Sequence, residues 1–396
     1  MTNHLTTARI LSVDALRGIT ILTMIFVNEL AGVEGIPSWM EHMPADADAM
    51  TFVDVVFPAF LFIVGMSIPF AIASRKAKGD TTLKLQWHII FRTIGLLVLG
   101  VFMVNAEGGY NEEAMGMSIH LWSLLFYISA ILVWNVYTFQ NKRLSFSLRL
   151  CGVAGLLILA IVFRGGEDGT NYLLPHWWGI LGLIGWAYFI SCSLYQLVNG
   201  NKTALIILVI AGTAYFMIGK SPWMQENSLS WIFSQGGHAT HTTVVLCGIL
   251  LALIFFDQRS GTAISRRFIE AFVFAGALIA AGYFLRPYYT ISKIYATPTW
   301  GLYSAAICCV LFSFLYWLID IRGVSRWTGF FKPTASNPLL TYIIPPIIFV
   351  VMQLLAVSWP AVFYQGVYGM IWSAVFAVGV MSSVILLNKL KIRLQL

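Results

Sequence analysis

Charged side chains are scarce in this sequence. Asp, Glu, Lys and Arg together make up 10% of its 396 residues, whereas hydrophobic residues make up 59%. An average soluble domain has about 25% charged residues. The scarcity of charge therefore excludes an ordinary soluble protein and predicts a membrane protein.

Cysteine is also scarce, and its spacing fits neither a disulfide framework nor a zinc site. The five cysteines all fall within apolar runs, at Cys151, Cys192, Cys247, Cys308 and Cys309. We expect these thiols to pack as small hydrophobic side chains.

Long apolar runs are abundant instead. A membrane-spanning helix needs about 20 mainly apolar residues, and twelve segments approach that length, the weakest being 146–164 and 203–219. The other ten lie near residues 13–31, 53–74, 88–106, 118–138, 177–198, 239–256, 268–285, 300–320, 337–357 and 367–388. The sequence predicts an all-α, polytopic transmembrane helix bundle of 11 or 12 spans, folded as a single domain over residues 1–396. The tandem prolines Pro345 and Pro346 predict a break within the eleventh span.

The basic residues are distributed unevenly between the connections. If both termini are cytoplasmic, only four of the 24 Lys and Arg residues face outward, namely Arg164, Lys220, Arg286 and Lys293. The other 20 face the cytoplasm, as the positive-inside rule requires. The net charge of +7 is thus a topology signal and does not indicate nucleic-acid binding. The first ten residues lack a small-residue cleavage site, which argues against a removed signal peptide.

Polar residues gather in the hairpin of residues 12–74, which contains the first two spans and their connection. Polar groups at membrane depth are costly and usually functional. Those of the hairpin are Asp14, Arg17, Asn28, His42 and Asp54. We therefore predict that this hairpin is the catalytic part of the chain.

The same hairpin resembles the transmembrane acyltransferases related to heparan-alpha-glucosaminide N-acetyltransferase, including their bacterial members. The matching motifs are SVDALRG, the FVN that ends at Asn28, the connecting His42, and FVDVVFP with FIVGMSI. Two further matches are NPLLTY at 337–342 and, more weakly, ISKIYATPTW before the tenth span.

The resemblance implies a membrane N-acetyltransferase of the glucosamine type in a bacterial-type inner (cytoplasmic) membrane. Acetyl-CoA would bind from the cytoplasm, and the acetyl group would pass to an amino sugar or glycan on the outer side. We expect no metal cofactor, and the sequence leaves the oligomeric state open, a homodimer included. A sugar or amino-sugar transporter, or an O-acyltransferase for a cell-envelope polymer, remains an alternative.

Acyl transfer from a thioester needs a base for the acceptor and a donor for the developing oxyanion. His42 is the candidate base or transient acyl carrier. Asn28 is the candidate oxyanion donor or imidazole orienter. Asp54 either fixes the tautomer of His42 or caps the second span, and the sequence favours neither role.

The candidate cofactor-binding residues are Arg17, Asp14, Arg92 and Asn337. Arg17 and Asp14 form either a neutralised pair at a helix start or a contact to the phosphates of the cofactor. Arg92 belongs to the strongly basic connection and span that follow the hairpin.

Three residues near the outer side are candidates for substrate binding. Lys293 and Trp300 lie in a segment rich in aromatics, which suits either sugar binding or the ordinary interfacial aromatic belt. His238 forms an HxxH pair with His241, for which a polar cap or a substrate contact is favoured over a zinc site because no third ligand is evident.

Overall fold

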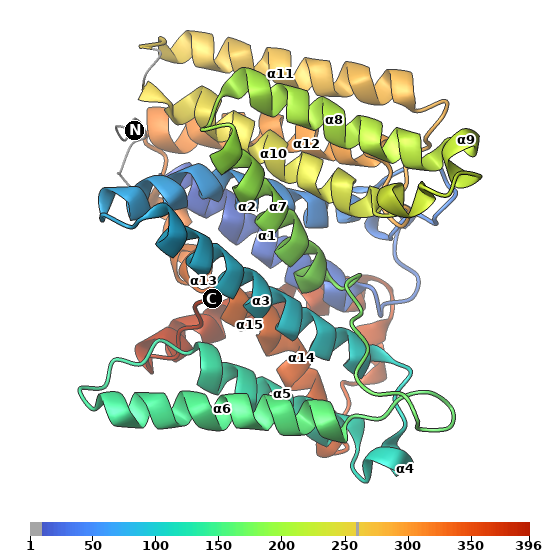
Figure 1. The fold of residues 1–396 in the computed structure, drawn as a ribbon. Coiled ribbons are helices and arrows are strands. Elements are labelled where there is room, and N and C mark those ends of the chain that lie inside the picture. Colours follow the sequence, from blue (N-terminus) through green and yellow to red (C-terminus); the bar gives the residue numbers. More distant parts are fainter. Residues whose placement is uncertain (1–9, 259–260) are drawn as a thin grey trace. The chain divides into compact units, whose positions relative to one another are not determined.

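Figure 1 shows the computed structural model of the chain, which describes residues 10–258 and 261–396. Within these residues the regular secondary structure is entirely helical. Ten segments are long and apolar enough to cross a membrane. They are α1 (Leu11–Leu30), α2 (Phe52–Ala77), α3 (Thr82–Glu107), α6 (Lys142–Val162), α7 (Ile180–Leu197), α8 (Lys202–Lys220), α10 (Gly236–Phe256) with the preceding turn η2 (Ser230–Phe233), α11 (Ile264–Leu285), α12 (Pro298–Tyr316) with η4 (Trp317–Ile321), and α15 (Gly366–Lys389). The chain is therefore a multi-pass membrane protein, and the predicted all-helical polytopic fold is confirmed.

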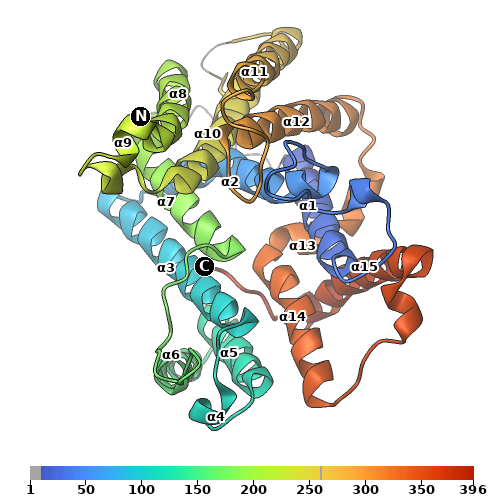
Figure 2. The same cartoon turned by 90° about the vertical axis from the view of Figure 1, so that its right-hand side faces the viewer.

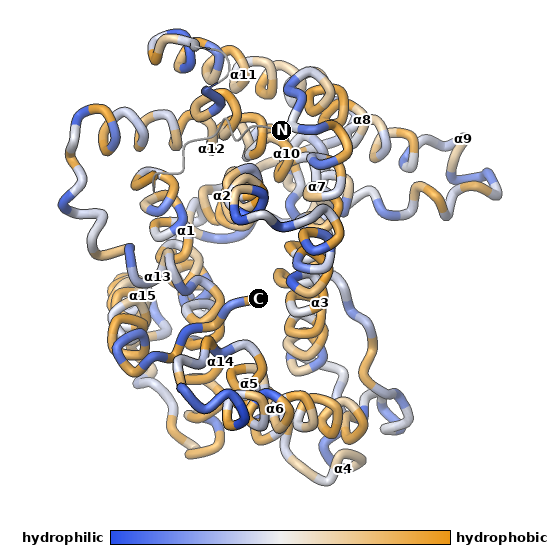
Figure 3. Tube along the Cα trace, turned by 60° about the vertical axis from the view of Figure 1, so that its left-hand side comes forward, coloured by the Kyte–Doolittle hydropathy of each residue, from blue (hydrophilic) through white to orange (hydrophobic). Residues whose placement is uncertain are grey.

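Shorter helices complete the chain. Two of them, α5 (Ile119–Trp134) and α14 (Pro338–Leu354), are apolar. The remainder lie in the connections: η1 (Ser38–Met40), α4 (Glu112–Met115), α9 (Pro222–Gln225), η5 (Arg326–Phe330), α13 (Lys332–Ser336) and η6 (Ala361–Tyr364). Figure 3 shows hydrophobic residues along the long helices and hydrophilic residues gathered in the connections.

Each of the twelve predicted spans coincides with a helix, but the order of their lengths differs from the prediction. The segments predicted to be weakest form α6 and α8, of 21 and 19 residues. Among the helices of the twelve predicted spans, the two shortest are instead α5 and α14, of 16 and 17 residues. Helix α5 ends early because the residues after Trp134 pair with the C-terminal tail, where Val136 N donates to the Arg393 carbonyl at 2.8 Å.

The predicted break at Pro345 and Pro346 is wrong. Helix α14 runs without interruption from Pro338 to Leu354. The two prolines have no N–H to donate to the carbonyls of Thr341 and Tyr342. Helix α14 also packs against α5 and α15, and such tertiary contacts stabilise a helix beyond its intrinsic propensity.

The described residues form two compact units, and α1, α3 and α7 each continue from one into the other. The first unit comprises the described residues up to Thr20, Pro37–Thr93 and Ile184–Gly329; the second comprises Ile21–Ile36, Ile94–Leu183 and Phe330–Leu396. The single domain stays a prediction. Arg9 and Arg259, two of the predicted cytoplasmic cations, lie outside the described residues. Nine of the first ten residues, predicted to lack a signal-peptide cleavage site, also lie outside them.

Helix α10 forms the core of the first unit. Of its most apolar 18-residue window, 89% is buried, and it packs on α2, α8 and α12 (Figure 2). Gly65 of α2 faces the Val245 carbonyl, and Gly248 of α10 faces the Phe62 carbonyl. A Cβ at either glycine would overlap backbone atoms, so these glycines allow the two helices to cross at backbone contact.

The second unit is held together by aromatic packing and by the C-terminal tail. The rings of Phe102, Trp122 and Phe126 stack with centroids 4.9–6.2 Å apart. Trp122 Nε1 also donates to the Leu159 carbonyl at 3.0 Å, which joins α5 to α6. Gln395 N donates to the Trp134 carbonyl at 2.9 Å, so the last residues close over the end of α5.

Candidate functional site

His42 and Asp54 are joined by a short hydrogen bond in the first unit. His42 lies in the connection between α1 and α2, and Asp54 lies in the first turn of α2. Their Nδ1 and Oδ1 atoms are 2.7 Å apart. Because a carboxylate only accepts hydrogen bonds, Nδ1 must carry the proton and Nε2 is left as an acceptor. The His42 side chain is 41% exposed, whereas that of Asp54 is 1% exposed.

Asp54 makes the contacts that both of the roles left open by the sequence require. Its Oδ2 accepts from Thr51 N at 3.1 Å, which is the helix-capping contact, and from Met43 N at 3.2 Å. Its Oδ1 accepts from His42. The same carboxylate therefore begins α2 and fixes both the backbone next to His42 and the tautomer of its ring.

Lys293 completes a charged group around His42. Its Nζ lies 3.1 Å from Nδ1 and 3.2 Å from Nε2 of the imidazole. Because Nζ is almost equidistant from the two ring nitrogens, it lies off the axis of the Nε2 lone pair, which stays open to a substrate. Burial lowers the pKa of Lys293, and the charge of Asp54 offsets part of this effect. Lys293, predicted to bind the substrate, contacts His42 in this structure, and its contact with a substrate stays a prediction.

An ion pair that the sequence analysis did not single out links the loops that carry His42 and Lys293. Arg286 Nε lies 3.1 and 3.2 Å from the two carboxylate oxygens of Asp48, and Arg286 Nη2 donates to the Asp48 carbonyl at 3.1 Å. Asp48 Oδ1 also accepts from Ile291 N at 2.8 Å. The sequence signal for this ion pair was the opposite charge of Asp48 and Arg286, whose loops are predicted to lie on the same side of the membrane.

Trp300 contacts the backbone of Asp54 at the start of α2. Its indole is fully buried and packs with Ile291 and Ala296. Its Nε1 donates to the Asp54 carbonyl at 3.1 Å. In this position Trp300 has no exposed surface to offer a substrate, so its role here is to hold the first turn of α2.

The two histidines of α10 lie deeper in the same unit. The His241 ring contacts those of Phe57 and Trp300, with centroids 5.3 and 6.0 Å away. The His238 ring lies 6.4 Å from that of Trp186. Among the described residues, no group of three or more His, Cys, Asp or Glu side chains is arranged to hold a metal ion. The substrate contact of His238 stays a prediction.

Arg17 bridges the first two spans. Its Nη1 donates to Asp14 at 3.2 Å, and its Nη2 donates to the Ser67 hydroxyl of α2 at 2.8 Å. The pair with Asp14 is the neutralised pair that the sequence allowed. The contact to Ser67 was not predicted and ties the guanidinium to the neighbouring helix.

A cluster of cations surrounds the start of α3. Arg75 pairs with Asp80 at 2.9 Å and lies 3.0 Å from His88 Nδ1. Hydrogen bonds from Lys84 and, to a smaller extent, from Arg75 lower the pKa of Asp80. Arg92 lies over the Tyr188 ring, 4.9 Å from its centroid.

The Nε of Arg92 is buried and has no hydrogen-bond partner within the described part of the chain. A buried guanidinium nitrogen without an acceptor is energetically costly. A contact between Arg92 and the cofactor stays a prediction.

Asn28 and Asn337 belong to the second unit. Asn28 is exposed on α1, and its action on His42 stays a prediction. Asn337 is fully buried. Its Nδ2 donates to Asn388 Oδ1 and to the Ile392 carbonyl, and its Oδ1 accepts from Leu394 N. A cofactor contact by Asn337 would require these bonds to break.

Comparison with known proteins agrees with the resemblance inferred from the motifs. Heparan-alpha-glucosaminide N-acetyltransferase from Mus musculus and that from Homo sapiens are each 34% identical to this chain over 97 residues. The match covers 24% of this chain and 14% of the relatives, so the chain spans only a small part of their length.

A family model covers more of the sequence. It matches residues 9–230, which include the whole His42 hairpin and the helices up to α9. This is more than half of the chain. By this match, the chain belongs to the family described as "Domain of unknown function (DUF5009)".

Proposed function

We propose that the chain is a membrane acyltransferase that moves an acetyl group from acetyl-CoA to an amine, with an amino sugar or glycan as the acceptor. The observation that carries this proposal is the hydrogen bond between His42 and Asp54, with Lys293 beside the free ring nitrogen. The partial match to an N-acetyltransferase in two mammals supports the same class of reaction.

In the proposed reaction, His42 moves one proton. The acceptor nitrogen attacks the thioester carbonyl, and Nε2 takes the proton that the nitrogen loses as the new C–N bond forms. When the C–S bond breaks, the imidazolium returns this proton to the sulfur of coenzyme A. Asp54 keeps Nδ1 protonated, so that Nε2 is always the nitrogen offered to the acceptor.

Lys293 supplies positive charge where the reaction develops negative charge. The tetrahedral intermediate carries an oxyanion, and a fixed donor beside it lowers the barrier. The Lys293 ammonium is within hydrogen-bond distance of the reactive nitrogen. A carbonyl bound next to Nε2 would therefore also be close to Nζ.

The donor would bind from the cytoplasmic side, because coenzyme A is multiply charged and does not cross lipid. With both termini cytoplasmic, the Arg75, His88 and Arg92 cluster faces the cytoplasm, in line with the distribution of Lys and Arg. Its unsatisfied guanidinium nitrogen suits a phosphate oxygen. Arg17, held by Asp14 and Ser67, is a second cationic contact on this side.

The test uses the purified full chain in lipid nanodiscs, which hold no gradient. Acetyl-CoA labelled in the acetyl group is supplied with D-glucosamine, and both the N-acetylated product and free thiol are measured. We expect equal amounts of both. The absence of transfer, combined with glucosamine uptake by proteoliposomes, would instead identify a transporter, and a product acetylated on oxygen would identify an O-acyltransferase.

A further inference from the structure

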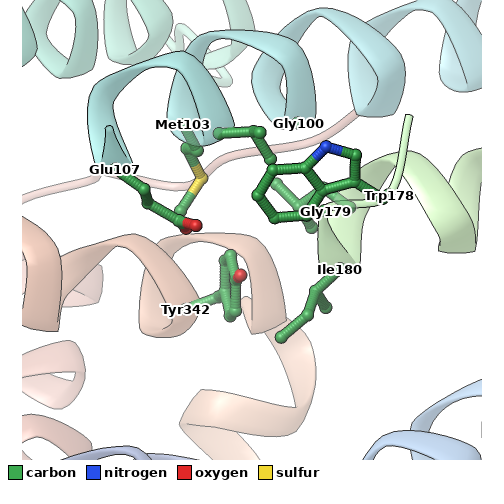
Figure 4. A pocket seen from close by; sticks show the side chains of 9 residues that line it. Gly100, Met103, Glu107, Trp178, Gly179, Ile180 and Tyr342 are labelled. Atoms are coloured by element: carbon green, nitrogen blue, oxygen red, sulfur yellow. The ribbon is translucent and has the colours of Figure 1, made fainter. Parts of the chain in front are cut away.

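We propose that a cavity in the second unit binds a protonated amine carried on a body about the size of one six-membered ring. The cavity has a volume of about 180 Å³. It is bounded by the last two turns of α3, by residues 178–181 at the start of α7, and by Tyr342 of α14 (Figure 4).

One wall of the cavity is formed by glycine backbone. Gly100 of α3 and Gly179 both line the space. A Cβ at Gly100 would lie 2.6 Å from Gly182 N, and one at Gly179 would overlap the Val104 side chain. These glycines let the two segments meet closely, so the remaining side chains project into the space rather than filling it.

Of the residues that line the cavity, Glu107 alone is charged, and its side chain is exposed. Glu107 is the last residue of α3, and the last turn of that helix contains no basic residue. The C-terminal end of a helix carries partial negative charge, which disfavours a carboxylate and favours a cation. Within the residues that the structure describes, the Glu107 carboxylate forms no hydrogen bond and no ion pair. A cationic ligand would supply the positive charge that this end of the helix favours.

The other groups in the cavity suit the body of such a ligand. In Figure 4, Glu107, the Tyr342 ring and the Trp178 indole surround the same space, with the Met103 side chain beside them. The Trp178 side chain is 60% exposed, so other residues leave much of its ring surface uncovered. Aromatic faces attract ammonium groups and also pack on ring-shaped bodies. A carboxylate with two aromatics therefore recognises both the charge and the ring.

The volume limits the size of the ligand. An apolar cavity of roughly 150 Å³ accommodates benzene, so this cavity accommodates one ring and its substituents. An amino sugar and a simple cyclic amine share the required chemistry. None of the residues in this cavity takes part in the proposed acetyl transfer, so the loss of binding in Glu107→Gln, rather than amine binding alone, distinguishes this cavity from the acceptor site near His42.

The experiment measures ligand binding to the full chain in nanodiscs, without acetyl-CoA, by isothermal titration calorimetry. The probes are D-glucosamine and cyclohexylamine, with N-acetylglucosamine and cyclohexanol as uncharged counterparts. We expect at least one amine to bind, and its counterpart to bind at least 10-fold more weakly. Binding of glucosamine alone identifies an amino-sugar site, whereas binding of both amines identifies a general cyclic-amine site.

Two variants locate the binding. Glu107→Gln should weaken amine binding at least 10-fold, and Trp178→Ala should weaken it while Trp178→Phe retains part of it. Glu113→Gln is the matched control, because Glu113 is an exposed carboxylate in the connection that follows α3. Equal affinity for the amines and their counterparts, or wild-type affinity in a folded Glu107→Gln variant, would overturn the proposal.

Discussion

The Nζ of Lys293 lies 3.2 Å from Nε2 of His42, the ring nitrogen that remains free after Nδ1 has bonded to Asp54. These two side chains are 251 residues apart in the sequence. Their contact places a positive charge beside the imidazole ring but off the axis of the Nε2 lone pair. The proposed chemistry depends on this arrangement, because one group must accept a proton while the other stabilises an oxyanion.

The role of Lys293 predicts a particular pH dependence. Burial lowers its pKa, so the ammonium loses its proton at a lower pH than an ordinary lysine does. Acetyl transfer should therefore fall as the pH rises through this lowered pKa, in a limb that begins below the ordinary lysine value of about 10.4. The measurement is kcat against pH at saturating substrates.

Substitution of Lys293 checks the origin of that limb. Lys293→Met should reduce kcat by about 100-fold to 1,000-fold, as loss of one oxyanion donor does, and should remove the limb. Lys293→Arg keeps the charge and should move the limb to higher pH. An unchanged alkaline limb in Lys293→Met would show that another group titrates.

Asp54→Asn should lower kcat by about 100-fold to 10,000-fold while changing both KM values little. An amide can offer its N–H to Nδ1, which leaves the imidazole proton on Nε2 and removes the acceptor. Asn also keeps an oxygen for the backbone N–H groups of Met43 and Thr51. The variant should thus remain folded, which its unfolding temperature would show. A change in KM with kcat unaffected would argue against a tautomer-fixing role for Asp54.

Asp48 and Arg286 should act as positioning residues. Arg286→Gln removes the ion pair between the loops, and misplacement of Lys293 should lower kcat on the order of 10-fold to 100-fold. The free energy of unfolding should change by less than about 1 kcal/mol, since the ion pair is partly exposed. Asp48 adopts a positive φ of 44°, which Asn tolerates well. Asp48→Asn should accordingly reproduce the kinetic effect without unfolding the loop.

The helices were predictable from the sequence because apolar length dictates a membrane span. The proximity of His42 and Asp54 could also be predicted, because they are twelve residues apart and few other polar groups border the first two spans. Asp48 and Arg286 are 238 residues apart, and local pattern carries no information on which distant loops meet. The buried position of Trp300 and the continuity of α14 through its prolines likewise depend on packing between remote helices.

The proposed orientation is tested by labelling single cysteines in a Cys151→Ser background, which removes the one native thiol on an exposed residue. Lys220→Cys at the end of α8 should react with an impermeant maleimide added to intact cells. Lys84→Cys at the start of α3 should react only after the membrane is permeabilised. The reverse pattern would contradict the cytoplasmic location of the Arg75 and Arg92 cluster.

In the proposed function, His42 carries the proton of an acetyl transfer. The most direct measurement is the rate of acetyl transfer from acetyl-CoA to an amine acceptor by the wild type, His42→Ala and His120→Ala, all in nanodiscs. His120 is a matched control because its ring contacts Phe349 in the second unit. We expect His42→Ala to lose at least about 100-fold in kcat with an unchanged unfolding temperature, while His120→Ala retains activity. Wild-type turnover in a folded His42→Ala variant would contradict this role of His42.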